Sequence, residues 1–278
     1  MEKIDFAWAP AGQCVHPQKI TLGKKGTGMG HYPSFFGVLK HPQWGVILYD
    51  TGYSEDFWRV TRSLPEKLYA LVTPVTCSPE ETLLWQLKQK GIHPEDVGLV
   101  IISHFHADHV CALAHFPRAK FSCFEQGLRS LMELCRWRQV ASGFLRQLLP
   151  ADFFTRILPI EKCVLVSLPT SLSPLERGYD LLGTGDILAI PLPGHSIGHT
   201  GLYFTTGNGR EVLIVGDAVW HSESIRSLVF PHPLTRLLMS NWGDYGRTML
   251  ALHQLHQRNP NLVMLPSHCL EHLGTFPL

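Results

Sequence analysis

One short stretch of this chain, which reads Ser-His-Phe-His-Ala-Asp-His, limits what it can fold into more than any other feature. It directly follows the apolar run Gly98–Ile102 (GLVII), which predicts a buried strand. Side chains alternate along an extended chain, so we expect His104, His106 and Asp108 to point to one side of it. His109 is expected to begin the following helix. Imidazoles and a carboxylate that leave one strand end are ligand types of a transition-metal site, which the stretch therefore predicts.

Three further segments place a histidine or an aspartate at the end of a predicted strand. His195 lies in a tight loop (PGHSIGHT) between two strands, Asp217 follows the run Glu211–Val215, and His268 follows the run Leu262–Leu265. Ligand sites of layered α/β folds gather at the carboxyl ends of strands, so we interpret these residues as parts of one site. The 16 histidines among 278 residues are an enrichment in the commonest metal ligand, which supports this interpretation.

Composition excludes several classes of protein. Apolar residues make up 45% and charged residues 17% of the chain, which excludes intrinsic disorder. Twenty-four basic residues face 23 acidic ones, and the net charge of +1 gives no case for a nucleic acid or a membrane as the main partner. No apolar stretch approaches the roughly 20 residues of a membrane helix. The 7 cysteines are scattered and the start MEKIDFAWAPAG lacks a leader pattern, so we expect a cytoplasmic protein with reduced thiols.

Helix and strand signals alternate along the chain, which predicts an α/β (α+β) fold with helices covering the sheets. Proline and glycine are spread evenly, so we expect one domain over residues 1–278, with a helical insert at about 126–149. The predicted helices are Ser54–Leu71, Ser78–Lys90, Gln126–Leu149 and Tyr245–Arg258. The predicted strands are Phe35–Lys40, Val46–Asp50, Gly98–Ile102, Ala119–Phe124, Lys162–Leu168, Asp180–Leu182, Ile187–Leu192, Thr200–Thr205, Glu211–Val215 and Leu262–Leu265.

The chain resembles the metallo-β-lactamase superfamily. The motifs of that superfamily occur in order, beginning with Asp50-Thr51-Gly52 and ending with His268, and they span nearly the whole chain. The resemblance implies a four-layer αβ/βα sandwich with two metal ions at the edge of the paired sheets. It further implies that Asp50 supports the site without being a ligand. The implied ligands of one ion are His104, His106 and His195, those of the other are Asp108, His109 and His268, and Asp217 bridges them.

The same residues suggest a reaction class. Three imidazoles on a zinc ion leave a position open for water, and two metal ions can share and activate that water. Asp108 is the candidate catalytic residue, which would orient the water and pass its proton to the leaving group. We therefore expect a metal-assisted hydrolase of an ester, lactone, thioester or related bond. Two zinc ions per chain suit this ligand set, as do iron, manganese or cobalt.

Within the superfamily the chain most resembles homoserine-lactone hydrolases. In those enzymes a tyrosine typically follows the bridging aspartate at the position where this chain has Trp220. The apolar segment Leu228–Met239 comes soon afterwards and predicts either a wall for an acyl chain or a homodimer contact. Trp220, Phe230 and His232 are the candidate substrate-binding residues. The expected partner is therefore a small-molecule substrate with an apolar part, and His199 is expected to support the site.

Three alternatives stay open. A glyoxalase-II-like thioesterase uses the same ligands, although such enzymes usually carry an added C-terminal helical domain. A persulfide dioxygenase resembles the His-x-His-x-Asp-His segment but holds one iron with fewer ligands, and the full set of ligands here favours two ions. A metal-binding signalling protein with little turnover is an alternative of a different class.

Overall fold

The computed structural model describes residues 4–278, which form two β-sheets. The first sheet has 7 strands in the order β4-β1-β2-β3-β5-β6-β7, and β3, β5, β6 and β7 run parallel to one another. Its strands are β1 (Asp5–Pro17), β2 (Met29–His41), β3 (Gly45–Tyr49), β4 (Val75–Thr76), β5 (Val97–Ile101), β6 (Lys120–Cys123) and β7 (Ile157–Pro159).

The second sheet has 6 strands in the order β13-β12-β11-β10-β9-β8. Antiparallel neighbours make up most of it, but β12 and β13 are parallel, so their carboxyl ends lie at the same edge. Its strands are β8 (Val164–Ser167), β9 (Arg177–Asp180), β10 (Ile187–Pro191), β11 (Thr200–Thr205), β12 (Glu211–Gly216) and β13 (Val263–Pro266).

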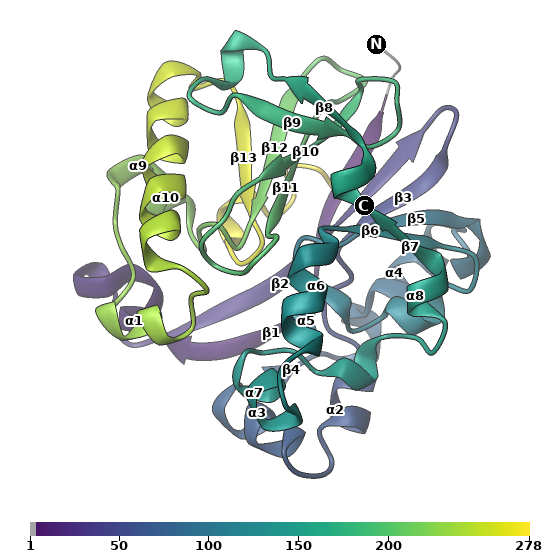
Figure 1. Cartoon of the computed structure of the whole chain (residues 1–278), viewed down its shortest axis with the longest axis vertical. Coiled ribbons are helices and arrows are strands. Elements are labelled where there is room, and N and C mark those ends of the chain that lie inside the picture. The colour runs from purple at the N-terminus through teal and green to yellow at the C-terminus, as the bar shows by residue number, and fades with distance from the viewer. Residues whose placement is uncertain (1–3) are drawn as a thin grey trace.

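Helices cover the outer faces of both sheets, so the predicted αβ/βα layering is confirmed (Figure 1). The first sheet is covered by α2 (Asp56–Val60), α3 (Glu66–Val72), α4 (Leu83–Gln89), α5 (Ala107–Val110), α6 (Glu125–Met132), α7 (Arg136–Ala141) and α8 (Phe153–Arg156). The second is covered by α9 (Ser222–Ser227) and α10 (Trp242–Arg258), while α1 (Gln18–Leu22) links β1 to β2. Among the described residues, no helix has the length and apolar character needed to cross a membrane.

The two sheets are held face to face by large buried side chains. Trp8 stacks on Phe35 with ring centroids 5.3 Å apart, and Phe204 and Ile214 pack into the same cluster from the second sheet. The hydroxyl of Tyr49 donates a hydrogen bond of 2.7 Å to the carbonyl of Thr200, which ties the sheets together. This apolar middle layer fixes the relative position of the strand ends that carry the predicted site.

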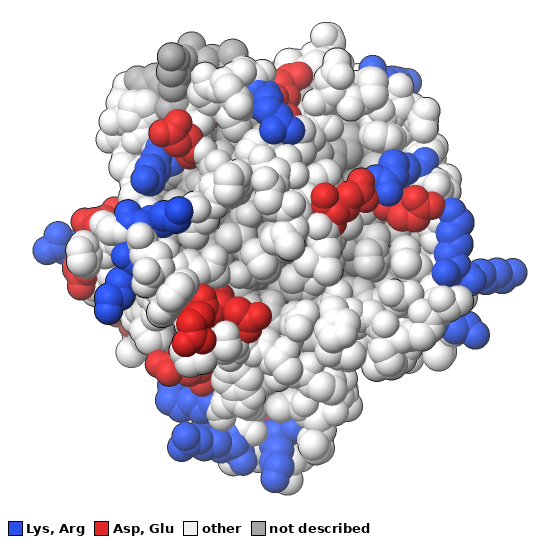
Figure 2. Space-filling model, turned by 180° about the vertical axis from the view of Figure 1, so that it is seen from behind, with Lys and Arg blue, Asp and Glu red and all other residues white. Residues whose placement is uncertain are grey.

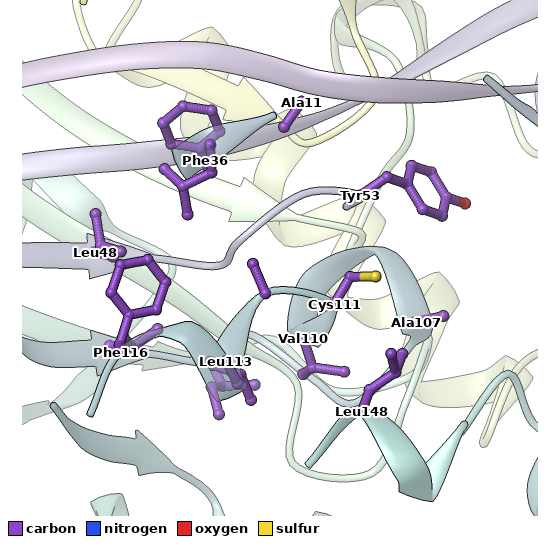
Figure 3. Packing of buried hydrophobic residues seen from close by; sticks show 14 of the residues in the cluster. Ala11, Phe36, Leu48, Tyr53, Ala107, Val110, Cys111, Leu113, Phe116 and Leu148 are labelled. Atoms are coloured by element: carbon purple, nitrogen blue, oxygen red, sulfur yellow. The ribbon is translucent and has the colours of Figure 1, made fainter. Parts of the chain in front are cut away.

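The short helix α5 is anchored to the core beneath the first sheet. Ala107, Val110 and Cys111 are fully buried and belong to the same cluster as Leu148, and Figure 3 shows their side chains with those of the neighbouring strands. The hydroxyl of Thr51 accepts a hydrogen bond of 3.1 Å from the backbone N–H of Ala112. Two of the predicted metal ligands lie on this helix, so its anchoring limits their movement.

Two predicted helices are broken in the structure. The long helix expected over Gln126–Leu149 is divided into α6, α7 and a final 3₁₀ turn, Arg146–Leu148. A continuous helix of that length would extend for about 36 Å and carry part of its apolar side chains away from the core. The breaks instead allow Leu128, Val140 and Phe144 all to be buried. The helix expected over Ser54–Leu71 is likewise divided, into α2 and α3, at a segment that ends in Pro65.

Most of the other predicted elements overlap the observed ones, but no strand was assigned to β1, β4 or β7. The strand predicted from Phe35 begins six residues after the start of β2, and the one predicted from Asp180 shares only that residue with β9. The predicted helix start at Ser78 is confirmed, because the backbone N–H of Ser78 donates to the Glu81 carboxylate at 2.7 Å in a capping box. That first turn is 3₁₀, and Thr82 then caps α4. Gly91, at the predicted stop, has a φ of 67°.

The buried carboxylate of Glu66 connects α3 to the divided segment. Arg136 of α7 donates two hydrogen bonds to it, at 2.8 and 2.7 Å, and the side-chain amide of Gln147 donates a third at 2.7 Å. Burial by itself would raise the pKa of Glu66, but the bonds from Arg136 and Gln147 lower the pKa below its usual value. A carboxyl with a lowered pKa stabilises the fold above the pKa it has when unfolded, and this contribution is lost as the pH falls.

We predict that Arg136→Ala lowers the free energy of unfolding by roughly 1–2 kcal/mol at neutral pH, because it leaves the buried carboxylate short of donors. The difference should shrink below about pH 4, where Glu66 of the unfolded chain is protonated. Urea denaturation at several pH values measures both effects. The matched control is Arg129→Ala, which breaks an exposed i,i+4 pair with Glu125 and should change stability by less than about 0.5 kcal/mol. Equal losses in both variants would contradict the prediction.

Candidate metal centre

All seven predicted ligands lie at one edge of the paired sheets. His104 and His106 occupy the loop after β5, and Asp108 and His109 lie on α5. From the second sheet, the loop after β10 contributes the imidazole of His195. Asp217 directly follows β12, and His268 lies two residues after the end of β13, which is parallel to β12. Strands of both sheets therefore end at this point, as the positions of the motifs predicted.

Three imidazoles converge in the first part of the cluster. The Nε2 atom of His195 lies 3.2 Å from Nε2 of His104 and 3.2 Å from Nδ1 of His106. Together with a carboxylate oxygen of Asp217, these ring nitrogens form one set whose ligand atoms all lie within 4.8 Å of one another. His104 and His195 are buried.

Asp108, His109 and His268 form the second set of the same kind. Oδ2 of Asp108 lies 3.3 Å from Nε2 of His109 and 3.5 Å from Nε2 of His268. Asp217 contacts both sets: its Oδ2 lies 3.1 Å from Nε2 of His268 and 3.4 Å from Nε2 of His195, and its Oδ1 lies 3.6 Å from Nε2 of His109. The carboxylate of Asp217 thus occupies a bridging position between the two sets.

The bonding capacity of these groups fits a cation. Burial, together with neighbouring imidazoles, lowers the pKa of His104 and His195 well below the usual value, so both rings are neutral. A neutral imidazole carries one N–H and one acceptor nitrogen, so rings whose acceptor nitrogens face one another leave some lone pairs without a hydrogen-bond donor. Within the described part of the chain, Nε2 of His109 and Oδ1 of Asp217, which lie 3.6 Å apart, have no hydrogen-bond partner. Buried lone pairs in this arrangement are what a divalent metal ion would satisfy.

The carboxylates of the cluster are held in their ionised form. Burial by itself raises the pKa of Asp108, but the imidazoles of His109 and His268 lower it below the usual value. For Asp217 the net effect is the same, because His268 and His109 outweigh burial. Conversely, burial would lower the pKa of His109, but Asp108, Asp50 and Asp217 raise it. Each set therefore contains one ionised carboxylate, Asp217 in the first and Asp108 in the second.

A second layer of contacts orients the imidazoles. Oδ2 of Asp50 lies 2.7 Å from Nδ1 of His109, while its Oδ1 accepts the backbone N–H of Ser103 at 2.8 Å. Nδ1 of His268 lies 2.8 Å from the carbonyl of Pro33. Both partners accept a proton from Nδ1 and so direct Nε2 of each ring into the cluster, which is the common pattern at metal-bound histidines. Asp50 therefore supports the site, as the resemblance implied.

Two glycines, which the sequence reading did not single out, allow close contacts around the cluster. Gly143 has a φ of 72°, and a Cβ at this position would lie 2.7 Å from the ring of His106. Gly194, with a φ of 127°, lies so close to the first turn of α10 that a Cβ would overlap the backbone of Tyr245. The divided helical segment and α10 thus hold His106 and His195 by direct packing.

His199 contacts the backbone of the bridging residue. The backbone N–H of Asp217 donates a hydrogen bond of 3.0 Å to Nε2 of His199. Burial lowers the pKa of His199 to about 3, so the ring is a neutral acceptor. His199 lies in neither metal set, which agrees with the supporting role expected for it.

The three candidate substrate residues have different surroundings. The indole N–H of Trp220 donates to Oδ2 of Asp217 at 3.2 Å, and its ring lies 5.8 Å from that of His195. Phe230 packs against Trp242 of α10, with centroids 6.3 Å apart. Nδ1 of His232 accepts the N–H of Leu234 and caps a 3₁₀ turn, Pro233–Leu237. Trp220 therefore contacts the metal centre directly, whereas His232 has a local structural contact.

One expectation about local geometry is wrong. His104, His106 and Asp108 were expected on one side of an extended chain. The strand β5 ends at Ile101, and Asp108 lies on α5 together with His109. Asp108 reaches the cluster because α5 begins at Ala107 and turns the chain back toward β2. There the hydroxyl of Ser34 donates a hydrogen bond of 3.3 Å to Oδ2 of Asp108.

Comparison with known proteins agrees with this geometry. Residues 33–123 match the model of the Metallo-beta-lactamase superfamily. A probable metallo-hydrolase of Mycobacterium tuberculosis is 27% identical over 244 residues, covering 81% of this chain and 71% of the relative. The N-acyl homoserine lactonase AttM of Rhizobium radiobacter is 30% identical over 138 residues, covering 49% of this chain and 46% of the relative.

A solved structure shares the fold. It is that of a B. thuringiensis AiiA mutant with N-decanoyl-L-homoserine bound at the active site, and it matches with a TM-score of 0.71. The sequences are 17% identical, and the match covers 99% of this chain and 96% of the other. The likeness to this structure shows the fold. The superfamily match over residues 33–123 and the relatives named as metallo-hydrolases indicate a metal-dependent hydrolase.

We predict that Asp50→Asn weakens metal binding by about 10–100-fold. The amide would turn an N–H toward Nδ1 of His109 and so favour the tautomer that carries its proton on Nε2. Titration with a competing chelator measures the affinity. The control is Asp56→Asn, because Asp56 also pairs with a histidine, His115, but lies outside both metal sets. Unchanged affinity in Asp50→Asn would contradict the assigned role.

Proposed function

We propose that this metal-dependent hydrolase, a chain with a metallo-beta-lactamase superfamily domain, binds two metal ions and cleaves an ester or lactone bond whose acyl part is apolar. An acyl-homoserine-lactone-like compound is the proposed substrate class. The single observation that carries the proposal is the position of Asp217, whose two oxygens contact both ligand sets.

The ligand sets support two ions rather than one. Seven ligand-type side chains exceed what a single tetrahedral ion uses, and they divide into one set of four and one of three. His104, His106 and His195 would hold one ion, Asp108, His109 and His268 the other, and Asp217 both. Nitrogen and oxygen ligands suit zinc, and also iron, manganese or cobalt. Bound there, the ions would act as Lewis acids that activate water and polarise the substrate carbonyl.

Asp108 is the proposed catalytic residue. Its lowered pKa keeps it ionised, so it can accept a proton from an attacking water molecule and later donate that proton to the departing oxygen. The hydroxyl of Ser34 donates to the backbone carbonyl of Asp108 at 3.0 Å, which fixes the start of α5 relative to β2. Because Asp108 lies on a buried helix, its carboxylate is held in place for both transfers.

The surroundings of Trp220 support an apolar substrate. Its ring lies beside His195 and packs against the apolar cluster beneath α10, while the segment that contains Phe230 follows it in the chain. The named relatives add support, since AttM is called an N-acyl homoserine lactonase and the AiiA mutant holds N-decanoyl-L-homoserine. A glyoxalase-II-like thioesterase and a signalling protein with little turnover remain as alternatives that the experiments below distinguish.

We expect elemental analysis to find two metal ions per chain in protein purified without chelator and supplied with zinc. His195→Ala, which removes a ligand of the first set, should lower the content toward one. The same preparations should hydrolyse lactones and esters faster than thioesters. One ion per chain after supplementation, with iron preferred, would instead favour the mononuclear dioxygenase alternative. Two ions without turnover of any substrate would favour the signalling alternative.

We predict that kcat/KM rises about three- to fourfold for each methylene added to the acyl chain until the pocket is filled, because each buried CH₂ contributes about 0.8 kcal/mol. Trp220→Ala should flatten this dependence. Trp220→Phe keeps an aromatic ring but loses the N–H that donates to Asp217, so it should retain the dependence at a lower overall rate. A flat response in the wild type would contradict an apolar acyl pocket beside Trp220.

A further inference from the structure

One end of the molecule exposes large apolar side chains. They belong to α3, to the segment just before it and to α7. We call them the apolar tip, and they are Leu64 (56% exposed), Leu68 (44%), Leu71 (65%), Val72 (68%) and Trp137 (57%). In Figure 1, α3 and α7 lie side by side at the lower end of the long axis, and the bonds from Arg136 to Glu66 join them.

The tip is a formed surface rather than a frayed segment. Tyr69 and Ala70 on the opposite side of α3 pack against the core of the first sheet, which turns Leu68, Leu71 and Val72 outward. The buried carboxylate of Glu66 fastens the helix to α7. Leucines held in this exposed position are unfavourable in water unless something covers them.

Positive charge surrounds the tip. Arg62, Lys67 and Arg138 are exposed, and among the described residues none of them forms an ion pair. In Figure 2, Lys and Arg side chains lie at this lower end of the molecule, with Asp and Glu side chains directly above them. The nearest exposed carboxylates along these segments are Glu55 and Glu133, so cations predominate. The carboxylate of Glu66 is buried and paired with Arg136, so it does not add negative charge to this surface.

We propose that the apolar tip is a peripheral docking site for an anionic lipid surface. The leucines and Val72 would enter the boundary between headgroups and acyl chains, and Trp137 would lie at the same level. Arg62, Lys67 and Arg138 would contact lipid phosphates. This surface is separate from the metal centre and goes beyond the proposed hydrolase function, because it concerns where the enzyme resides when it acts.

The observations favour lipid over a protein partner. The tip lies at the end of the long axis and projects from the molecule, which suits insertion into a soft surface (Figure 1). A second copy of the chain on the same patch would place like charges against each other, which is unfavourable. The net charge of +1 gave no expectation of a membrane partner. That value sums the charges of the whole chain, so it does not show that cations lie together beside the apolar tip.

The experiment is flotation of the full chain with vesicles. Vesicles of phosphatidylcholine alone are compared with an equal mixture of phosphatidylcholine and phosphatidylglycerol. We expect binding to the mixture only, weakened by salt. The double variant Leu68→Ser with Leu71→Ser should bind at least tenfold more weakly, and Arg62→Gln with Lys67→Gln should lose about fivefold per charge. The matched control, Val164→Ser with Leu165→Ser on exposed β8, should bind like the wild type.

A second measurement reports how deeply Trp137 enters the lipid bilayer. Brominated lipids should quench part of the tryptophan fluorescence, and Trp137→Phe should remove that part. Failure of the wild type to float with anionic vesicles overturns the proposal, and so does equal binding by the leucine variant and the control. Concentration-dependent dimerisation that the leucine variant abolishes, without vesicle binding, would assign the tip to self-association instead. None of these outcomes depends on turnover, so they are independent of the test of hydrolase function.

Discussion

The structure depends on the gathering of five imidazoles and two carboxylates, all of them buried except His106, around one point where the two sheets meet. Polar groups removed from water are unfavourable unless they find partners, and several nitrogens of this cluster face one another rather than a donor. The surrounding elements are arranged to hold this otherwise repulsive set together. Asp50, Ser103 and the carbonyl of Pro33 engage the outer atoms of the rings, and the apolar packing of α5 fixes the helix that carries two ligands.

The sequence pointed to the same seven residues that the structure brings together, because the chemistry is local. A histidine or aspartate that follows an apolar strand is visible in the residue order, and parallel strands bring such residues to one edge whatever the loops between them do. The αβ/βα layering followed from the alternation of helix and strand signals, together with the resemblance to a known superfamily. His199 was placed correctly outside the metal sets because it is the second histidine of its loop motif.

Features that depend on packing between distant segments could not be read from the sequence. The breaks in Gln126–Leu149 follow from the need to bury Leu128, Val140 and Phe144 together, which no local propensity records. The contact between Gly143 and His106 joins residues from separate elements, and a glycine after a helix has many uses. The hydrogen bond from Trp220 to Asp217 was also hidden, since a position three residues after a ligand does not determine where an indole N–H points.

The spacing of the ligands along the chain has a consequence for how the enzyme is made. Cluster members extend from His104 to His268, so a growing polypeptide displays the first four long before the last one leaves the ribosome. Until β12 and β13 have paired, Asp217 and His268 cannot join them, and any ion captured earlier is held by an incomplete set. The complete set of seven ligand-type side chains therefore exists only after β13 has formed.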